Sequence, residues 1–242
     1  MERFYYDLHV HSCLSPCAEN DNTPSSIAGM GAVIGLDIVA LTDHNTTKNC
    51  PAFFKAAEAY NVIPIAGMEL TTSEDIHVIC LFPTLDEAMK FDGLVSERLM
   101  KIKNRPEIFG DQLILDEEDN VIGSVDNLLS VATDISIEAL PELVDSFGGV
   151  CYPAHIDRES NGIIAILGTL PEHPGFNTVE LNRAESYDSY SERFSLSDKT
   201  VVFNSDSHSL GVMNEREHYI ELVADRSNPD AVAKELIERL RY

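Results

Sequence analysis

Cationic charge is scarce in this chain of 242 residues, where Lys and Arg number 17 against 41 Asp and Glu. The formal net charge at pH 7 is therefore −24. A protein that binds duplex nucleic acid needs a cationic footprint to displace counterions from the phosphates, and a polybasic membrane anchor needs clustered cations. The composition thus predicts that neither long duplex nucleic acid nor a membrane is a partner.

Long apolar runs, a signal-peptide core and a regular cysteine framework are also missing. No apolar run reaches about 18 residues, the length that spans a bilayer. Residues 1–7 lack the apolar core of a secretory signal, which favours a cytoplasmic protein. Five cysteines at irregular spacing in such a protein do not predict disulfides, and Cys80 and Cys151 lie in strand-like runs where cysteine is usually a core residue.

A chain of this length can bury a full core without metals or disulfides as staples. No internal repeat or low-complexity linker divides it, so we expect a single domain over 1–242. Helical signals fall between many of its short β-rich runs, and this alternation predicts an α/β fold with a mostly parallel sheet or barrel. The β-rich runs are 4–9, 36–42, 62–68, 76–82, 149–154, 177–182 and 199–204.

Helix-start signals support this pattern at several points. Thr23 precedes a proline, which is typical of an N-cap followed by proline at the first helical position. Thr84 and Glu87 form a capping-box pattern at the start of another helix. A further helix is expected over 136–147, where Pro141 is a candidate bend.

Two stretches depart from the alternation. Only residues 72–75 separate the run that ends near Leu70 from the next run, which is too short a link for a parallel crossover. These two strands should be antiparallel, which places Glu69 beside His77. Residues 100–135 are less regular, with a hairpin over 112–123, and we interpret them as an insertion that is a candidate lid.

Six of the eight histidines lie at the ends of predicted strands, with carboxylates between them. His9 and His11 share one face of the first strand, because alternate residues in a strand point the same way. The rest of the set is Asp43, His44, Glu69, His77, His155, Asp206 and His208. In a barrel-like α/β fold, strand carboxyl ends converge on one face, where active sites form. His173 and His218 lack this setting and are interpreted as ordinary loop and strand-face residues.

The chemistry of this set points to metal binding. Any one of these histidines alone is more simply a hydrogen-bonded residue near the surface, but six surface histidines have no reason to choose strand ends. Neutral imidazole and carboxylate are ligands that suit Zn²⁺, Mn²⁺ and Fe. Nine such groups exceed the needs of one ion, so we expect two or three divalent ions.

The ordered motifs resemble those of the PHP (polymerase and histidinol phosphatase) domain family over nearly the whole chain. They are His9-x-His11, Thr42-Asp43-His44, Gly67-Met68-Glu69, His77, Ala154-His155 and Asp206-x-His208. The resemblance implies a distorted seven-stranded β/α barrel, here with a small insertion, that binds up to three divalent metals. It also implies a phosphoesterase that acts on small phosphate monoesters or on nucleotide and nucleic-acid phosphates.

The resemblance further implies three sets of ligands. The first ion would be held by His9, His11, Glu69 and Asp206. The second would be held by Glu69, His77 and His155, with Glu69 bridging. The third would involve His44 and His208.

The third set departs from the family pattern. Family members usually have an Asp or His five or six residues after the second histidine of the first motif, where this chain has Pro16 and Cys17. Cys17 is a candidate replacement as a thiolate ligand, and Glu19 and Asp21 are alternatives nearby.

Clustered divalent ions would generate hydroxide near neutral pH for attack on phosphorus. Beside the bridging Glu69, Asp43, Asp206 and His208 are the candidates for assisting proton transfer. Arg158 and Arg183, which follow predicted strands, are candidate phosphate clamps, although a solvated arginine is the simpler interpretation of each.

Two alternatives remain open from the sequence. Metal-bound hydroxide does not itself choose phosphorus, so a metallohydrolase of C–N or C–O bonds is one of them. The other is a non-catalytic metal-binding or regulatory module, although nearly all the family ligands are present here. The expected substrate is a small phosphorylated molecule, a nucleotide or a short oligonucleotide.

Overall fold

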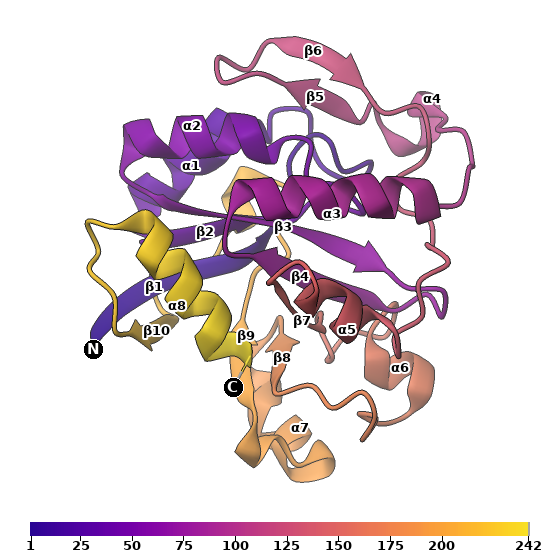
Figure 1. Ribbon diagram of the computed structural model, residues 1–242, viewed down its shortest axis with the longest axis vertical. Helices are drawn as coiled ribbons and strands as arrows, with labels where there is room; N and C mark the ends of the chain where they lie inside the picture. Colours follow the sequence, from indigo (N-terminus) through magenta and orange to yellow (C-terminus); the bar gives the residue numbers. More distant parts are fainter. Residues whose placement is uncertain (242) are drawn as a thin grey trace.

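The computed structural model describes residues 1–241, which form an α/β fold around a curled six-stranded mixed sheet (Figure 1). β1, β2 and β3 run parallel, β4 is antiparallel to both its neighbours, and β10 is antiparallel to β1. In spatial order the strands are β10 (Tyr219–Leu222), β1 (Glu2–Val10), β2 (Ile38–Leu41), β3 (Ile63–Thr71), β4 (His77–Phe82) and β7 (Val150–Pro153). A separate parallel pair consists of β8 (Thr178–Leu181) and β9 (Thr200–Phe203).

Each of the seven predicted strand runs contains a strand. The antiparallel turn expected at 72–75 is confirmed, because Thr71 lies opposite His77 in the β3–β4 ladder. β10 has no counterpart among the predicted runs, and it extends the sheet at the outer edge of β1.

The seven-stranded barrel is not confirmed in detail. Within residues 1–241 one ladder runs through six strands, and the β8–β9 pair joins it only through isolated hydrogen bonds. Between the end of β7 and β8, the Ile156 amide donates to the Glu180 carbonyl oxygen, at 2.9 Å. Near the junctions the chain leaves the extended path, with φ of 28° at His155 and 52° at Asp206, so a regular ladder cannot continue there. The sheet is therefore a half-barrel.

Apolar layers cover both faces of this sheet. The helices α1 (Pro24–Ile34), α2 (Cys50–Tyr60) and α3 (Leu85–Arg98) pack on its outer face. The C-terminal helix α8 (Pro229–Arg241) packs on the other face, where Leu236 shares a buried cluster with Leu8. Strands that are buried on both faces are apolar throughout, which explains the continuous apolar runs in the sequence.

The helix-start signals are largely confirmed. The hydroxyl oxygens of Thr23 and Thr84 each accept a hydrogen bond from an amide in the first turn of the following helix. The helix expected over 136–147 is shorter, because α5 spans only Leu140–Asp145. Pro141 lies in its first turn, where a missing N–H costs no helical hydrogen bond, and it therefore does not bend the helix.

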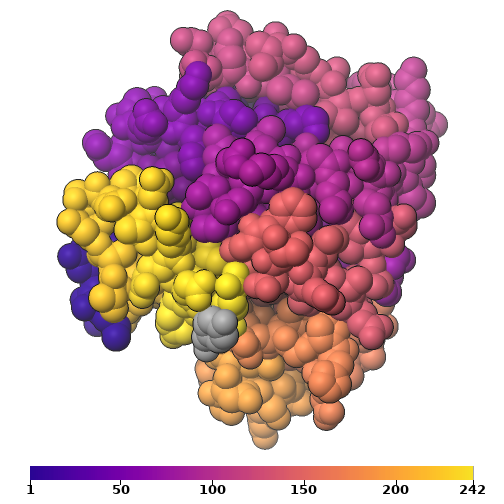
Figure 2. All heavy atoms as spheres, in the orientation of Figure 1, coloured from indigo at the N-terminus to yellow at the C-terminus, as the bar shows by residue number. Residues whose placement is uncertain are grey.

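The stretch 100–135 leaves the main sheet and forms the upper part of the molecule in Figures 1 and 2. The hairpin predicted over 112–123 is present, as β5 (Leu113–Leu115) and β6 (Val121–Ser124). The role of residues 100–135 as a lid stays a prediction. The remaining helices are the short α4 (Pro106–Phe109), α6 (Ile163–Leu167) and α7 (Tyr187–Phe194).

No helix within residues 1–241 is both long enough and apolar enough to cross a membrane.

Candidate metal centre

The histidines and carboxylates singled out in the sequence meet at one end of the half-barrel. Isolated backbone bridges bring their loops together: one joins His44 to Glu69, and another joins Val10 to Ser207. Most of the side chains are buried, and only those of His77 and His208 keep some exposure, at 14% and 28%. Carboxyl ends of parallel strands, together with the start of the antiparallel β4, therefore build a single site.

Four of these residues form a compact group. Asp206 Oδ1 lies 3.2 Å from His9 Nε2 and 3.1 Å from His11 Nε2. Glu69 completes the group, with Oε1 3.4 Å from His9 Nε2 and Oε2 3.3 Å from His11 Nε2. One ligand atom from each residue lies within 4.8 Å of the others. This group matches the first ligand set implied by the resemblance.

The hydrogen bonding of two oxygens in this group indicates whether a metal ion would fit there. Glu69 Oε2 and Asp206 Oδ1 are buried and accept no well-aligned hydrogen bond within residues 1–241, although imidazole nitrogens lie as near as 2.9 and 3.1 Å. A buried carboxylate oxygen without a partner is costly, since it has lost its water. A divalent cation between the carboxylates and the imidazoles would satisfy both oxygens, so the residues present fit a metal site.

Glu69 is also the centre of a second group. Its Oε1 lies 2.8 Å from His77 Nδ1 and 3.0 Å from His155 Nε2. Its Oε2 lies 2.9 Å from His44 Nδ1. The atoms within 4.8 Å of one another belong to His44, Glu69 and His77, whereas the resemblance implied His155 in place of His44.

A third group consists of His11, His44 and His208. Cys17 adjoins it, because its Sγ lies 3.3 Å from His44 Nε2, although the thiol is not part of the compact set. The alternative ligand Glu19 reaches this group through its backbone, whose amide donates to the His208 carbonyl oxygen at 3.0 Å. Ligation by Cys17 stays a prediction.

The carboxylates shape the protonation of their neighbours. Burial alone would lower the pKa of His9, but Glu180, Asp206 and Glu69 outweigh it and hold that pKa well above the ordinary value. Burial is likewise outweighed at His11, whose pKa rises to about 9 beside Asp206 and Glu69. In turn the imidazoles hold the pKa of Glu69 well below its usual range, although burial acts to raise it. The centre of the cluster therefore attracts positive charge.

The outer histidines differ from one another. Glu69 raises the pKa of His44 to about 9 against the opposing effect of burial. Burial and the nearby His11 and His44 lower the pKa of His208 to about 3, so this imidazole is neutral at physiological pH. Burial also lowers the pKa of His77. Divalent ions need neutral imidazoles as ligands and would supply the charge that the carboxylates attract.

Glu180 is a site residue that the sequence analysis missed. Its Oε1 lies 2.9 Å from His9 Nδ1 and accepts a hydrogen bond from the His155 amide, also at 2.9 Å. Its Oε2 accepts from the Asn204 side-chain amide at 2.6 Å. The sequence feature that could have identified it is a single glutamate inside the apolar run 177–182. A carboxylate behind a histidine orients the ring and leaves the other nitrogen free to bind a metal.

Asp43 contacts the histidine cluster indirectly, through Ser15. Its carboxylate accepts hydrogen bonds from the Ser12 amide, the Ser12 hydroxyl and the Ser15 hydroxyl, each at 2.7 Å. Ser15 Oγ also lies 2.9 Å from His11 Nδ1. Asp43 and Ser15 thus orient His11 in the way that Glu180 orients His9. This placement favours a positioning role for Asp43 over direct proton transfer.

The two predicted phosphate clamps differ. Arg158 reaches the centre, where its guanidinium pairs with Asp206 Oδ2 while its side chain stays 48% exposed. Arg183 instead donates to the carbonyl oxygen of Asp157 at 3.0 Å, which holds its side chain beside that residue. The geometry therefore favours Arg158 as the clamp.

Solved structures share this fold. The lesion-specific endonuclease EndoQ from Pyrococcus furiosus aligns with a TM-score of 0.69 and 16% identity, over 96% of this chain and 55% of that one. Endonuclease Q bound to a 27-mer duplex with an abasic lesion aligns with a TM-score of 0.65 and 17% identity, over 96% and 56%. A Bifidobacterium adolescentis protein assigned as a metal-dependent phosphoesterase aligns with a TM-score of 0.59 and 19% identity, over 96% and 95%. This chain spans little more than half the length of EndoQ.

The EndoQ complex corrects one expectation from composition. The net charge of −24 predicted that long duplex nucleic acid is excluded as a partner, but a protein of the same fold holds a duplex with its lesion at the active site. The exclusion was wrong because net charge is a sum over the whole surface. Contact with a phosphate chain depends on the local field near the site, where bound cations dominate.

Sequence comparison identifies the family. A search of curated proteins found no match to this chain. The model of the PHP domain matches residues 7–169, which is more than half of the chain. That range contains the histidine motifs from His9 to His155, and the geometry above brings these residues together around Glu69. The chain belongs to the PHP domain family.

Proposed function

We propose that the protein is a metal-dependent phosphoesterase that hydrolyses a phosphate ester at the centre built around Glu69. One observation carries this proposal: two buried carboxylate oxygens, Glu69 Oε2 and Asp206 Oδ1, face converging imidazole nitrogens without a well-aligned hydrogen bond. Family membership and the shared fold of the phosphoesterase and the endonuclease above support a hydrolase.

The donor set suits two or three ions of Zn, Mn or Fe, since imidazole and carboxylate bind all three. His9, His11, Glu69 and Asp206 would hold one ion, and Glu69 would share a second with His77 and with His44 or His155. When bound, such ions lower the pKa of water and stabilise charge on phosphoryl oxygens.

Groups of the chain itself would orient the reactants. Glu180 and the Ser15–Asp43 pair hold the rings of His9 and His11, so their Nε2 atoms face the centre. Arg158 stands half-exposed beside the centre, where its guanidinium can move from Asp206 to a substrate phosphate.

His208 is the best placed proton carrier. Its side chain keeps partial exposure at the edge of the cluster, so in a two-ion centre, where His208 is not a ligand, its imidazole can exchange protons with substrate and solvent. Asp206, whose Oδ1 contacts the imidazoles of His9 and His11, is better placed as a ligand.

Cys17 is proposed as a ligand of a third ion with His44 and His208. Its Sγ approaches His44 Nε2 at 3.3 Å, and the loop that carries it is linked to His208 by a backbone hydrogen bond from Glu19. A thiolate at this position would favour Zn or Fe over harder metals.

A substrate screen with varied metals tests the function. Purified protein would be loaded with Mn, Zn or Fe and assayed against phosphate monoesters, nucleotides, short oligonucleotides, carboxylic esters and amides, with Glu69→Gln as the inactive control. Metal-dependent release of phosphate or cleavage of a phosphodiester supports the proposal. Turnover of amides or carboxylic esters alone would assign the centre to C–N or C–O bonds, and tight metal binding without any turnover would make the protein a binding module.

A further inference from the structure

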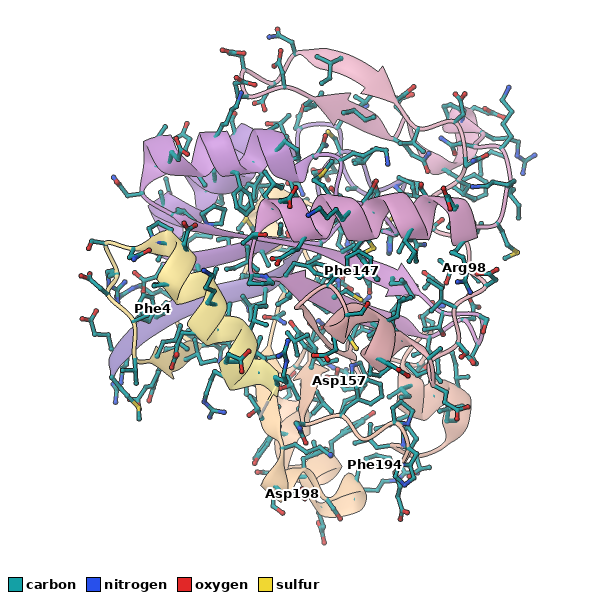
Figure 3. The ribbon with its side chains drawn as sticks, viewed as in Figure 1. Phe4, Arg98, Phe147, Asp157, Phe194 and Asp198 are labelled. Atoms are coloured by element: carbon teal, nitrogen blue, oxygen red, sulfur yellow. The ribbon has the colours of Figure 1, made fainter. Side chains whose placement is uncertain are left out.

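Residues 98–109 form a basic segment in an acidic protein. The segment carries Arg98, Lys101, Lys103 and Arg105 and a single acidic residue, in a chain whose net charge is −24. Lys101, Lys103 and Arg105, here called the basic rim, are exposed. Within residues 1–241 none of these three forms an ion pair, whereas Arg98 pairs with Asp134. The segment starts at the end of α3, where Figure 3 labels Arg98.

Most other cations of the described chain are neutralised by a carboxylate. The paired ones are Arg3, Lys48, Lys55, Lys90, Arg98, Arg158, Arg183, Arg226 and Arg241. A polyanion that approaches this acidic surface therefore meets, at the basic rim, cations close in sequence that have no carboxylate partner within residues 1–241, although the Lys101 ammonium donates to the Ser96 carbonyl oxygen.

The basic rim borders the metal centre. The Leu128 amide donates to the Ile102 carbonyl oxygen at 2.7 Å, which joins the rim to the segment that follows the β5–β6 hairpin. That segment in turn contacts Asn45, whose side-chain amide donates to the Leu129 carbonyl oxygen at 2.6 Å. Asn45 directly follows His44, so residues 128–129 connect the rim to the loop that carries this histidine.

A second contact leads from the rim to the loop of Cys17. The Asn104 side-chain amide donates to the Gly110 carbonyl oxygen at 2.8 Å. Gly110 has φ of 93°, and a Cβ there would lie only 2.7 Å from the Pro16 carbonyl oxygen. Only glycine permits this close approach, which holds the basic segment against the loop that contains Cys17.

Apolar side chains lie between the cations. Met100, Ile102 and Ile108 are 47%, 48% and 56% exposed. The guanidinium of Arg105 lies 5.9 Å from the centroid of the Phe109 ring. Aromatic rings beside cations are typical of surfaces that bind single strands, because unpaired bases stack on them and a duplex hides its base faces. Phe109, half-buried beside Arg105, is such a ring.

We propose that the basic rim binds the phosphate backbone of a single-stranded nucleic acid and directs the strand to the metal centre. The inference rests on the proposed phosphoesterase function for the reaction itself, but the binding surface is independent of it. A small monoester at the centre would not reach the rim, so the two substrate classes respond differently to changes there.

The experiment compares two triple variants with the wild type. One combines Lys101→Gln, Lys103→Gln and Arg105→Gln. The matched control combines Arg193→Gln, Lys234→Gln and Arg239→Gln, which are exposed residues of α7 and α8 that also form no ion pair within residues 1–241. Fluorescence anisotropy with a phosphorothioate single strand would give the dissociation constant at several salt concentrations, and the duplex of the same sequence would be measured in parallel. Hydrolysis of a chromogenic phosphate ester would be measured on each metal-loaded variant.

Three lost phosphate contacts should weaken binding on the order of 100-fold at ~0.1 M salt and reduce the log–log salt slope by about 2. The control should bind like the wild type, and all three proteins should hydrolyse the chromogenic ester alike. Unchanged strand binding by the rim variant, an equal loss in the control, or tighter binding of the duplex would each overturn the proposal. If the strand binds through the rim but no ester is hydrolysed, the rim assignment stands and the phosphoesterase function fails.

Discussion

Glu180 Oε1 lies 2.9 Å from His9 Nδ1, and both side chains are fully buried. Because Nδ1 is engaged by the carboxylate, His9 presents Nε2 to Asp206, at 3.2 Å from Oδ1. His11 has the same arrangement, with Ser15 and Asp43 behind it. The metal centre is therefore supported by a layer of oxygen atoms that hold its imidazoles in one orientation.

Replacing Glu180 by Gln should weaken metal binding by about 10- to 100-fold, because the ring of His9 loses its charged partner. Titration of metal into the metal-free protein, followed by calorimetry, measures the change. Glu221→Gln, an exposed glutamate of β10 that pairs with Arg3, is the matched control and should bind metal like the wild type. Equal metal affinity in a folded Glu180→Gln variant would contradict the positioning role.

Glu69→Gln should lower kcat/KM by more than about 100-fold, equivalent to about 2.7 kcal/mol. Glu69 approaches five imidazoles within 3.4 Å, and the amide would replace one of its charged oxygens with a donor. Steady-state assays on the best substrate of the screen, at saturating metal, measure the loss. Activity within about tenfold of the wild type would rule out Glu69 as the bridging ligand.

Metal binding should raise the melting temperature, because ions that bind only the folded state stabilise it by about 2.7 kcal/mol at 100 times their dissociation constant. Differential scanning fluorimetry with and without a chelator measures the shift. Its pH dependence has a definite sign: protons compete for imidazoles whose pKa is raised, to about 9 at His11 and His44, so metal affinity should rise with pH through neutrality. A shift that is constant from about pH 6 to about pH 8 would contradict this competition.

Cys17→Ser should remove roughly one ion per chain, and Cys17→Asp should restore it with a preference for harder metals, since soft sulfur selects Zn and Fe. Elemental analysis of the purified variants gives the stoichiometry, and the thiolate–metal absorption of the cobalt-substituted protein reports the bond directly. Full metal content in Cys17→Ser, with no change in the cobalt spectrum, would leave the thiol without a ligand role.

Much of the fold follows from short-range patterns. The seven strand runs and the caps at Thr23 and Thr84 are readable because strand and helix periods and cap chemistry act over a few residues. The antiparallel β3–β4 pair followed from the length of a single link. These short-range rules carry no information on partners that are distant in sequence. The pairing of β10 with β1 and the break in the ladder beside β8 were therefore not predicted.

The sequence by itself determined the family and the histidines and carboxylates that converge, because strand ends in an α/β fold deliver their side chains to one face whatever the details of packing. Only the tertiary structure decided which atoms support them. His9 and Glu180 are 171 residues apart, and Asp43 proves to face Ser12 and Ser15 rather than the centre. The same holds for the basic rim: net charge adds all residues equally, whereas ion pairing and burial decide which cations remain free at the edge of the site.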